Sequence, residues 1–124
     1  MFAKRVFRWA GIYGLLAVAP QYFLETRTGV DYPPPVTHPE FYYGFVGVTV
    51  AFQVVFLIIS TDPVRYRPMM IAAMIEKASF AFAMPILYLQ HRIPALVLGF
   101  SLIDLTLGIL FAVSYISTSA SGRP

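Results

Sequence analysis

The chain has 124 residues, of which 58% are hydrophobic and 12% charged, and its formal net charge is +3. Soluble domains usually carry about twice that charged fraction, and the length leaves room for one compact unit without a separate soluble domain. Cysteine is absent, which excludes disulfides, thiolate metal sites, haem attached through cysteine and a cysteine nucleophile.

The hydropathy pattern predicts an integral membrane protein with four spans. A span needs about 20 apolar residues to cross the hydrocarbon core, and four stretches meet this condition. They are residues 6–24, 41–60, 68–90 and 94–117. Short connections between the later spans favour antiparallel neighbours. We therefore expect a single domain over residues 1–124, an all-α antiparallel transmembrane four-helix bundle.

The first span also has features of a secretory signal. Basic residues precede its apolar run, which ends in the small residues Ala17 to Ala19. Pro20 would follow the cut and disfavours cleavage, so we expect a retained first helix. Pro20 should also kink or end that helix.

The distribution of Lys and Arg predicts the orientation. With the N-terminus in the cytoplasm, Arg27 and Arg92 lie outside, and a larger set lies inside. That set is Lys4, Arg5, Arg8, Arg65, Arg67 and Arg123. Since basic residues favour the cytoplasmic side, we expect both termini inside, in a bacterial cytoplasmic membrane. Basic residues placed at span ends in this way indicate no nucleic-acid partner.

Only three charged side chains lie well inside the spans: Glu76, Lys77 and Asp104. A rise of about 1.5 Å per residue places all three, with Gln53 of the second span, in the middle third of the membrane. A charge there costs about 2.5–3.5 kcal/mol unless it is paired, hydrated or used. We expect the pairs to be interhelical, Lys77 with Asp104 and Glu76 with Gln53 or a tyrosine hydroxyl.

This polar cluster has two interpretations. It can be structural, because buried ion pairs specify helix packing without adding stability. It can instead be a pocket for a ligand, or a proton-accepting site in which Glu76 or Asp104 acts as acid or base. The residues alone leave both open.

Two peripheral groups are weaker candidates. Arg65 and Arg67 in the inner hairpin can hold an anionic lipid headgroup, although they also suffice as topology signals. The outer histidines and carboxylates match no compact ligand motif, so we expect no metal site, and no cofactor motif is present. The outer set is Glu25, Asp31, His38, Glu40 and His91.

The number of spans, the proline in the first span and the glutamate in the third resemble the small bacterial membrane proteins grouped as DoxX-like. Residues 38–44 (HPEFYYG) and 75–80 (IEKASF) are similar to parts of such proteins. A remoter similarity is to the EXPERA group of four-helix, sterol-isomerase-like and sterol-binding proteins, which place acidic residues in an intramembrane cavity. The resemblance implies the four-helix architecture and assigns no catalytic residue.

Taken together, these observations favour a non-catalytic membrane protein. It would bind a hydrophobic small molecule or lipid at the polar cluster, or serve as an accessory subunit that packs against a membrane-protein partner or its own copies. The alternatives are a membrane enzyme, isomerase- or oxidoreductase-like, acting on a lipid-soluble substrate through Glu76 or Asp104, and a proton-coupled transporter.

Overall fold

The structure, a computed structural model, describes residues 1–121, and within them it is helical throughout with no strand. This confirms the all-α class. The elements in chain order are α1 (Phe2–Val18), the 3₁₀-helix η1 (Ala19–Phe23), α2 (Glu25–Asp31), α3 (Pro39–Thr61), α4 (Met69–Leu89) and α5 (Ala95–Ser121). The short helix α2 was not predicted from the sequence.

Three helices of the described chain, α3, α4 and α5, are long and apolar enough to cross a membrane. They support an integral membrane protein. As Pro20 predicts, the first α-helix ends before it, at Val18, and continues as η1. With 17 residues, α1 alone is about 26 Å long, slightly shorter than the hydrocarbon core.

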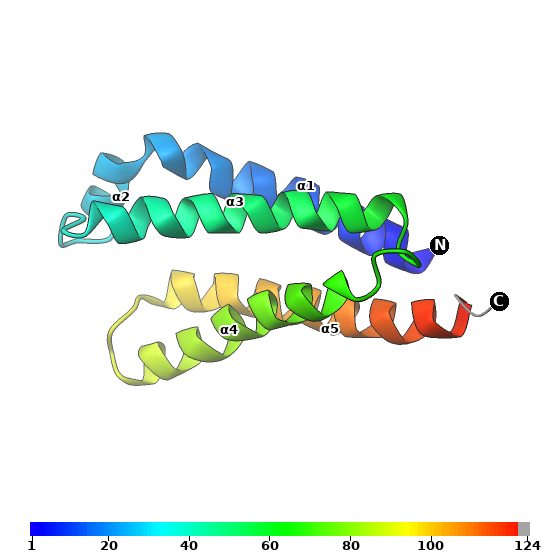
Figure 1. The fold of residues 1–124 in the computed structure, drawn as a ribbon. Helices are drawn as coiled ribbons and strands as arrows, with labels where there is room; N and C mark the ends of the chain where they lie inside the picture. The colour runs from blue at the N-terminus through cyan, green and yellow to red at the C-terminus, as the bar shows by residue number, and fades with distance from the viewer. Residues whose placement is uncertain (122–124) are drawn as a thin grey trace.

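The long helices form two antiparallel pairs, α1 with α3 and α4 with α5 (Figure 1). Contacts are extensive within each pair, and the pairs meet mainly where α1 touches α5 and, less, where α3 touches α4. The connection over residues 62–68 joins the two pairs at the end that carries the N-terminus. At the opposite end, each loop of the described chain stays within its own pair.

Close approach within the first pair depends on small residues. Gly11 and Gly14 of α1 are buried against α3, and a Cβ at Gly11 would lie 2.9 Å from the backbone oxygen of Gln53. Small residues at helix contacts allow such approach in membrane proteins, where lipid provides no hydrophobic drive for helix association.

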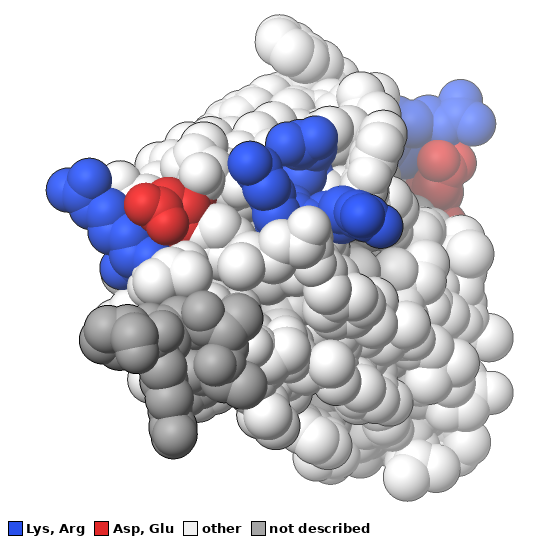
Figure 2. All heavy atoms as spheres, turned by 90° about the vertical axis from the view of Figure 1, so that its right-hand side faces the viewer, with Lys and Arg blue, Asp and Glu red and all other residues white. Residues whose placement is uncertain are grey.

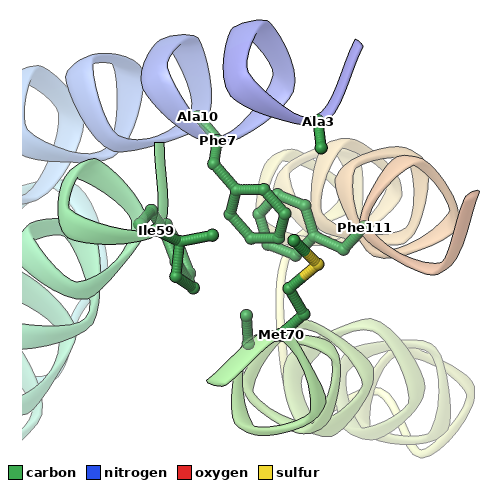
Figure 3. Packing of buried hydrophobic residues seen from close by; sticks show 8 residues of the cluster. Ala3, Phe7, Ala10, Ile59, Met70 and Phe111 are labelled. Atoms are coloured by element: carbon green, nitrogen blue, oxygen red, sulfur yellow. The ribbon is translucent and has the colours of Figure 1, made fainter. Parts of the chain in front are cut away.

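A cluster of three aromatic rings holds the two pairs together near the N-terminal end (Figure 3). The rings of Phe7 and Phe111 stack at a centroid distance of 4.2 Å, and Phe56 meets Phe111 edge-on at 4.9 Å. Met70 of α4 completes this cluster, so all four long helices contribute to it. Fully buried aromatic side chains of this size contribute most of the packing energy of such a core.

The same end is rich in basic residues (Figure 2). Lys4, Arg5 and Arg8 lie in the first turns of α1, while Arg65 and Arg67 lie in the 62–68 connection. The structure therefore places these five predicted inner residues at one end of the molecule. Arg123, the sixth, lies outside the described residues.

Candidate functional site: a cleft between the helix pairs

A cleft of about 930 Å³ lies between the two helix pairs, beyond the aromatic cluster. All four long helices line it, through the second half of α1, the middle of α3, the middle of α4 and the first half of α5. Its volume is within the range of sites that bind small molecules, which are mostly apolar with a few placed polar groups. The cleft has both properties, as its lining residues show.

The apolar wall consists largely of aromatic side chains. Phe45 and Phe52 belong to α3, Phe80 to α4 and Phe100 to α5, and Tyr13 joins them from α1. Aromatic rings offer a large contact area for an apolar ligand. The sequence marked these residues as aromatic but did not separate the lining rings from those that face outward, since both kinds have the same composition.

The polar part of the cleft is an ion triad, which we define as Glu76, Lys77 and Asp104. Lys77 Nζ lies 3.2 Å from Asp104 Oδ1, to which it donates a hydrogen bond, and 3.6 Å from Glu76 Oε2. One ammonium thus bridges two carboxylates from neighbouring helices. A buried ammonium needs such partners, because leaving it unpaired costs far more than an ion pair gains.

The interhelical pair between Lys77 and Asp104 agrees with the prediction from the sequence. The expected pair of Glu76 with Gln53 or a tyrosine is wrong, because Glu76 contacts Lys77 instead. Neighbouring side chains on a helix project about 100° apart. The long stem of Lys77 bridges that angle while its Nζ lies near Asp104.

Burial differs within the ion triad. The Lys77 side chain is 6% exposed, whereas those of Glu76 and Asp104 are each 18% exposed. Lys77 Nζ also lies 5.4 Å from the centre of the Phe56 ring, on the side of the aromatic cluster. The carboxylates are therefore the more open face of the triad.

Gln53 lines the cleft from α3 and is 1% exposed. Its Nε2 donates to the backbone oxygen of Thr49 at 2.9 Å, one turn earlier on the same helix. Its Oε1 packs against Gly14 and has no hydrogen-bond partner in residues 1–121. The structure thus brings all four predicted polar residues to one cleft, although Gln53 is not bonded to the ion triad.

Arg65 and Arg67, the predicted headgroup ligands, lie outside the cleft and differ in their contacts. Arg67 Nε donates to the backbone oxygen of Tyr115 at 2.9 Å, and its guanidinium lies 3.6 Å above the Tyr115 ring. Arg67 therefore fastens the 62–68 connection to α5. Arg65 remains exposed, and its backbone N–H donates to the Asp62 side chain.

At the opposite end of the molecule, three of the five predicted outer residues, Asp31, His38 and Glu40, form local pairs. His38 Nδ1 lies 2.9 Å from Glu40 Oε1, and Arg27 pairs with Asp31 at 3.0 Å. No group of three potential metal ligands occurs in the described part of the chain. The Tyr42 hydroxyl donates to the backbone oxygen of Gln21 at 2.7 Å and so ties η1 to α3.

Comparison of the chain with protein-family models, with curated proteins and with solved structures finds no match. The resemblance to DoxX-like and EXPERA proteins therefore stays a prediction.

Proposed function

We propose that the protein spans the membrane four times and binds a hydrophobic small molecule or lipid in the cleft, with the polar part of the ligand at the ion triad. The observation that carries this proposal is the combination of an aromatic-lined space of about 930 Å³ with a paired charge cluster on its wall. A purely structural ion cluster needs no such space beside it.

The proposed topology includes α1 as a membrane span in addition to α3, α4 and α5. Together α1 and η1 contain 17 and 5 residues, about 26 Å and about 10 Å at the usual rise of each helix type, enough to cross a bilayer. The basic residues gathered at one end support a cytoplasmic location for that end, and hence for both termini. A bacterial cytoplasmic membrane remains our proposal for the host membrane.

Topology can be tested with single cysteines because the chain has none of its own. Val64→Cys lies in the 62–68 connection, and Thr37→Cys lies in the loop before α3. A membrane-impermeant maleimide added to intact cells should label the second variant only, and lysis should expose the first. Labelling of Val64→Cys in intact cells would refute the proposed orientation.

Ligand binding can be tested with a photoreactive alkyl alcohol and the protein in lipid nanodiscs, with labelled residues mapped by mass spectrometry. We expect labels on cleft residues, and we expect Ala72→Phe to reduce them because Ala72 lines the cleft. The matched control is Ile71→Phe, which changes the neighbouring, outward-facing residue. Equal cleft labelling in parent, variant and control would contradict binding in the cleft.

A membrane enzyme is the second candidate, supported by the position of Glu76 and Asp104 on the cleft wall within reach of a bound molecule. Compounds that co-purify with the protein can be added back and reanalysed for a change of mass. Turnover that is lost in Glu76→Gln while binding persists would favour the enzyme. Recovery of every compound unchanged would favour a binding protein.

The accessory-subunit alternative can be tested by native mass spectrometry of gently extracted protein. A stoichiometric protein partner would favour it, and a single chain that carries a small molecule would favour the cleft as the functional site.

A further inference from the structure

The charge of the ion triad indicates what kind of head group the cleft accepts. Two carboxylates share one ammonium, so the ionised cluster carries a net charge of −1. Lys77 is the only Lys or Arg among the described residues that line the cleft. The other basic residues of the described chain lie near the ends of the helices or in the connections. With both carboxylates ionised, the cleft is therefore one positive charge short of neutrality.

The more exposed side of the ion triad is formed by the two carboxylates. Lys77 is the least exposed of the three and lies toward Phe56, whereas each carboxylate retains 18% exposure. A molecule that enters the cleft thus meets carboxylate groups before it meets the ammonium. An anionic head group would have to displace both carboxylates from Lys77 to form an ion pair.

The buried polar side-chain atoms of the cleft that lack a hydrogen bond from the described residues are both acceptors. Gln53 Oε1 is buried without a hydrogen bond from residues 1–121, and Glu76 Oε2, which is ion-paired with Lys77 at 3.6 Å, accepts no hydrogen bond from them either. The bond from Gln53 Nε2 to Thr49 already uses one donor of that amide. A buried acceptor without a donor is costly, and a ligand that donates hydrogen bonds would remove this cost. Both atoms are covered, so a donor reaches them only after a side-chain rotation.

We infer that the cleft selects lipophilic amines, with an alkylammonium head beside Glu76 and Asp104 and the apolar body along the aromatic wall. This inference rests on the proposed binding function and adds its ligand class. The head group supplies the missing positive charge and up to three N–H donors. Aromatic side chains line the cleft, and their ring faces attract cations.

The test uses three photoreactive probes that share one twelve-carbon chain and differ only in the head: an amine, an alcohol and a carboxylate. The protein is held at neutral pH in nanodiscs of zwitterionic lipid, and cleft labelling is normalised to labelling of the outward helix surfaces. We expect the amine to label the cleft about tenfold more strongly than the alcohol, because hydrogen bonds to charged groups are stronger than neutral ones. The carboxylate should label it least.

Asp104→Asn should remove most of the preference for the amine over the alcohol, because it removes one of the two carboxylates beside the head group. Asp62→Asn is the matched control, since it removes a carboxylate in the 62–68 connection, outside the cleft. If Asp104→Asn fails to fold, Glu76→Gln provides the same test, because both carboxylates are equally exposed.

The outcomes separate this inference from the proposed function. Equal cleft labelling by amine and alcohol, or stronger labelling by the carboxylate, would overturn the amine preference and leave binding in the cleft intact. Absence of cleft labelling by all three probes would refute both. An amine preference that survives in Asp104→Asn and Glu76→Gln alike would also overturn the assignment to the ion triad.

Discussion

Replacing Lys77 by methionine removes the only cation that lines the cleft within the described chain and keeps an unbranched side chain of similar length. The stem has to stay unbranched because α5 packs closely there, and a Cβ at Gly108 would lie 3.3 Å from Lys77 Cβ. Lys77→Met therefore changes the charge of the ion triad with little change in packing.

The expected loss of unfolding free energy in Lys77→Met follows from the two ion pairs of Lys77. At an effective dielectric of about 20, the gross attraction at 3.2 Å and at 3.6 Å is about 5 kcal/mol each, and desolvation cancels most of it. Removing one partner of a buried pair usually costs about 3–5 kcal/mol. Because Glu76 and Asp104 are partly open and one can take up a proton, we expect about 3 kcal/mol for Lys77→Met, the lower end of that range.

Unfolding in mixed micelles with a rising fraction of denaturing detergent, followed by helical circular dichroism, measures this cost. The control is a triple variant that combines Glu76→Gln, Lys77→Met and Asp104→Asn and leaves no charge. It should recover most of the lost stability, since neutral replacement of a whole buried ion cluster is often harmless.

Two results would refute this reasoning. A Lys77→Met variant within about 0.5 kcal/mol of the parent, the usual effect of an exposed surface change, would mean that the ion pairs do not hold the helices. A triple variant as unstable as the single one would assign the loss to packing around the methionine and not to unpaired carboxylates.

Three further changes test the packing, with the same unfolding assay. Gly14→Ala should destabilise the protein by about 1–3 kcal/mol, because the new Cβ collides with the Gln53 side chain. The control Gly44→Ala meets nothing within 4 Å and should not destabilise the protein. Equal effects of the two changes would contradict the close approach of α1 and α3. Phe111→Ala should cost about 3–5 kcal/mol by emptying the centre of the aromatic cluster, and a cost below 1 kcal/mol would argue against that cluster. Arg67→Lys keeps the charge but loses the planar guanidinium that stacks on Tyr115 of α5, so we expect the free energy of unfolding to fall by about 1 kcal/mol. An unchanged unfolding midpoint would indicate that Arg67 acts only as a topology signal.

Much of the candidate site could be predicted because a helix has a fixed rise. Counting about 1.5 Å per residue from each expected span end placed Gln53, Glu76, Lys77 and Asp104 at similar depth, and the structure lines one cleft with all four. Hydropathy likewise located α3, α4 and α5 to within a few residues. These inferences depend only on distances along single helices.

The partner of Glu76 could not be predicted in the same way. Helix geometry separates adjacent side chains by angle, but a lysine stem is flexible enough to bring its ammonium between a neighbour and a residue of another helix. Gln53 was expected to pair with Glu76 of another helix, but its side-chain amide donates to the carbonyl of Thr49 on its own helix. Both errors come from long polar side chains, whose rotamers depend on packing.

A ligand pocket was one of two interpretations of the sequence, but the presence of the cleft could not be decided from the residues because it depends on how two helix pairs meet. The chain connects the pairs only through residues 62–68, and the aromatic cluster holds them together near that end. Most helix contacts lie within each pair, and fewer join one pair to the other. Toward the other end, apolar side chains between the pairs therefore line a cleft. No periodicity along one helix encodes that separation.

The ion triad joins these two regions, because Lys77 lies toward Phe56 of the aromatic cluster while Glu76 and Asp104 line the cleft. Three apolar side chains in these positions would hold the helices at least as well, since replacing a buried ion cluster is often neutral or stabilising. Stability alone therefore does not explain why two carboxylates and one ammonium occupy the wall of a hydrophobic space. When both carboxylates are ionised, the excess negative charge in that space is a cost to the empty protein, and the same excess makes the binding of a cation favourable. This reciprocity favours a ligand-binding role for the ion triad over a purely structural one.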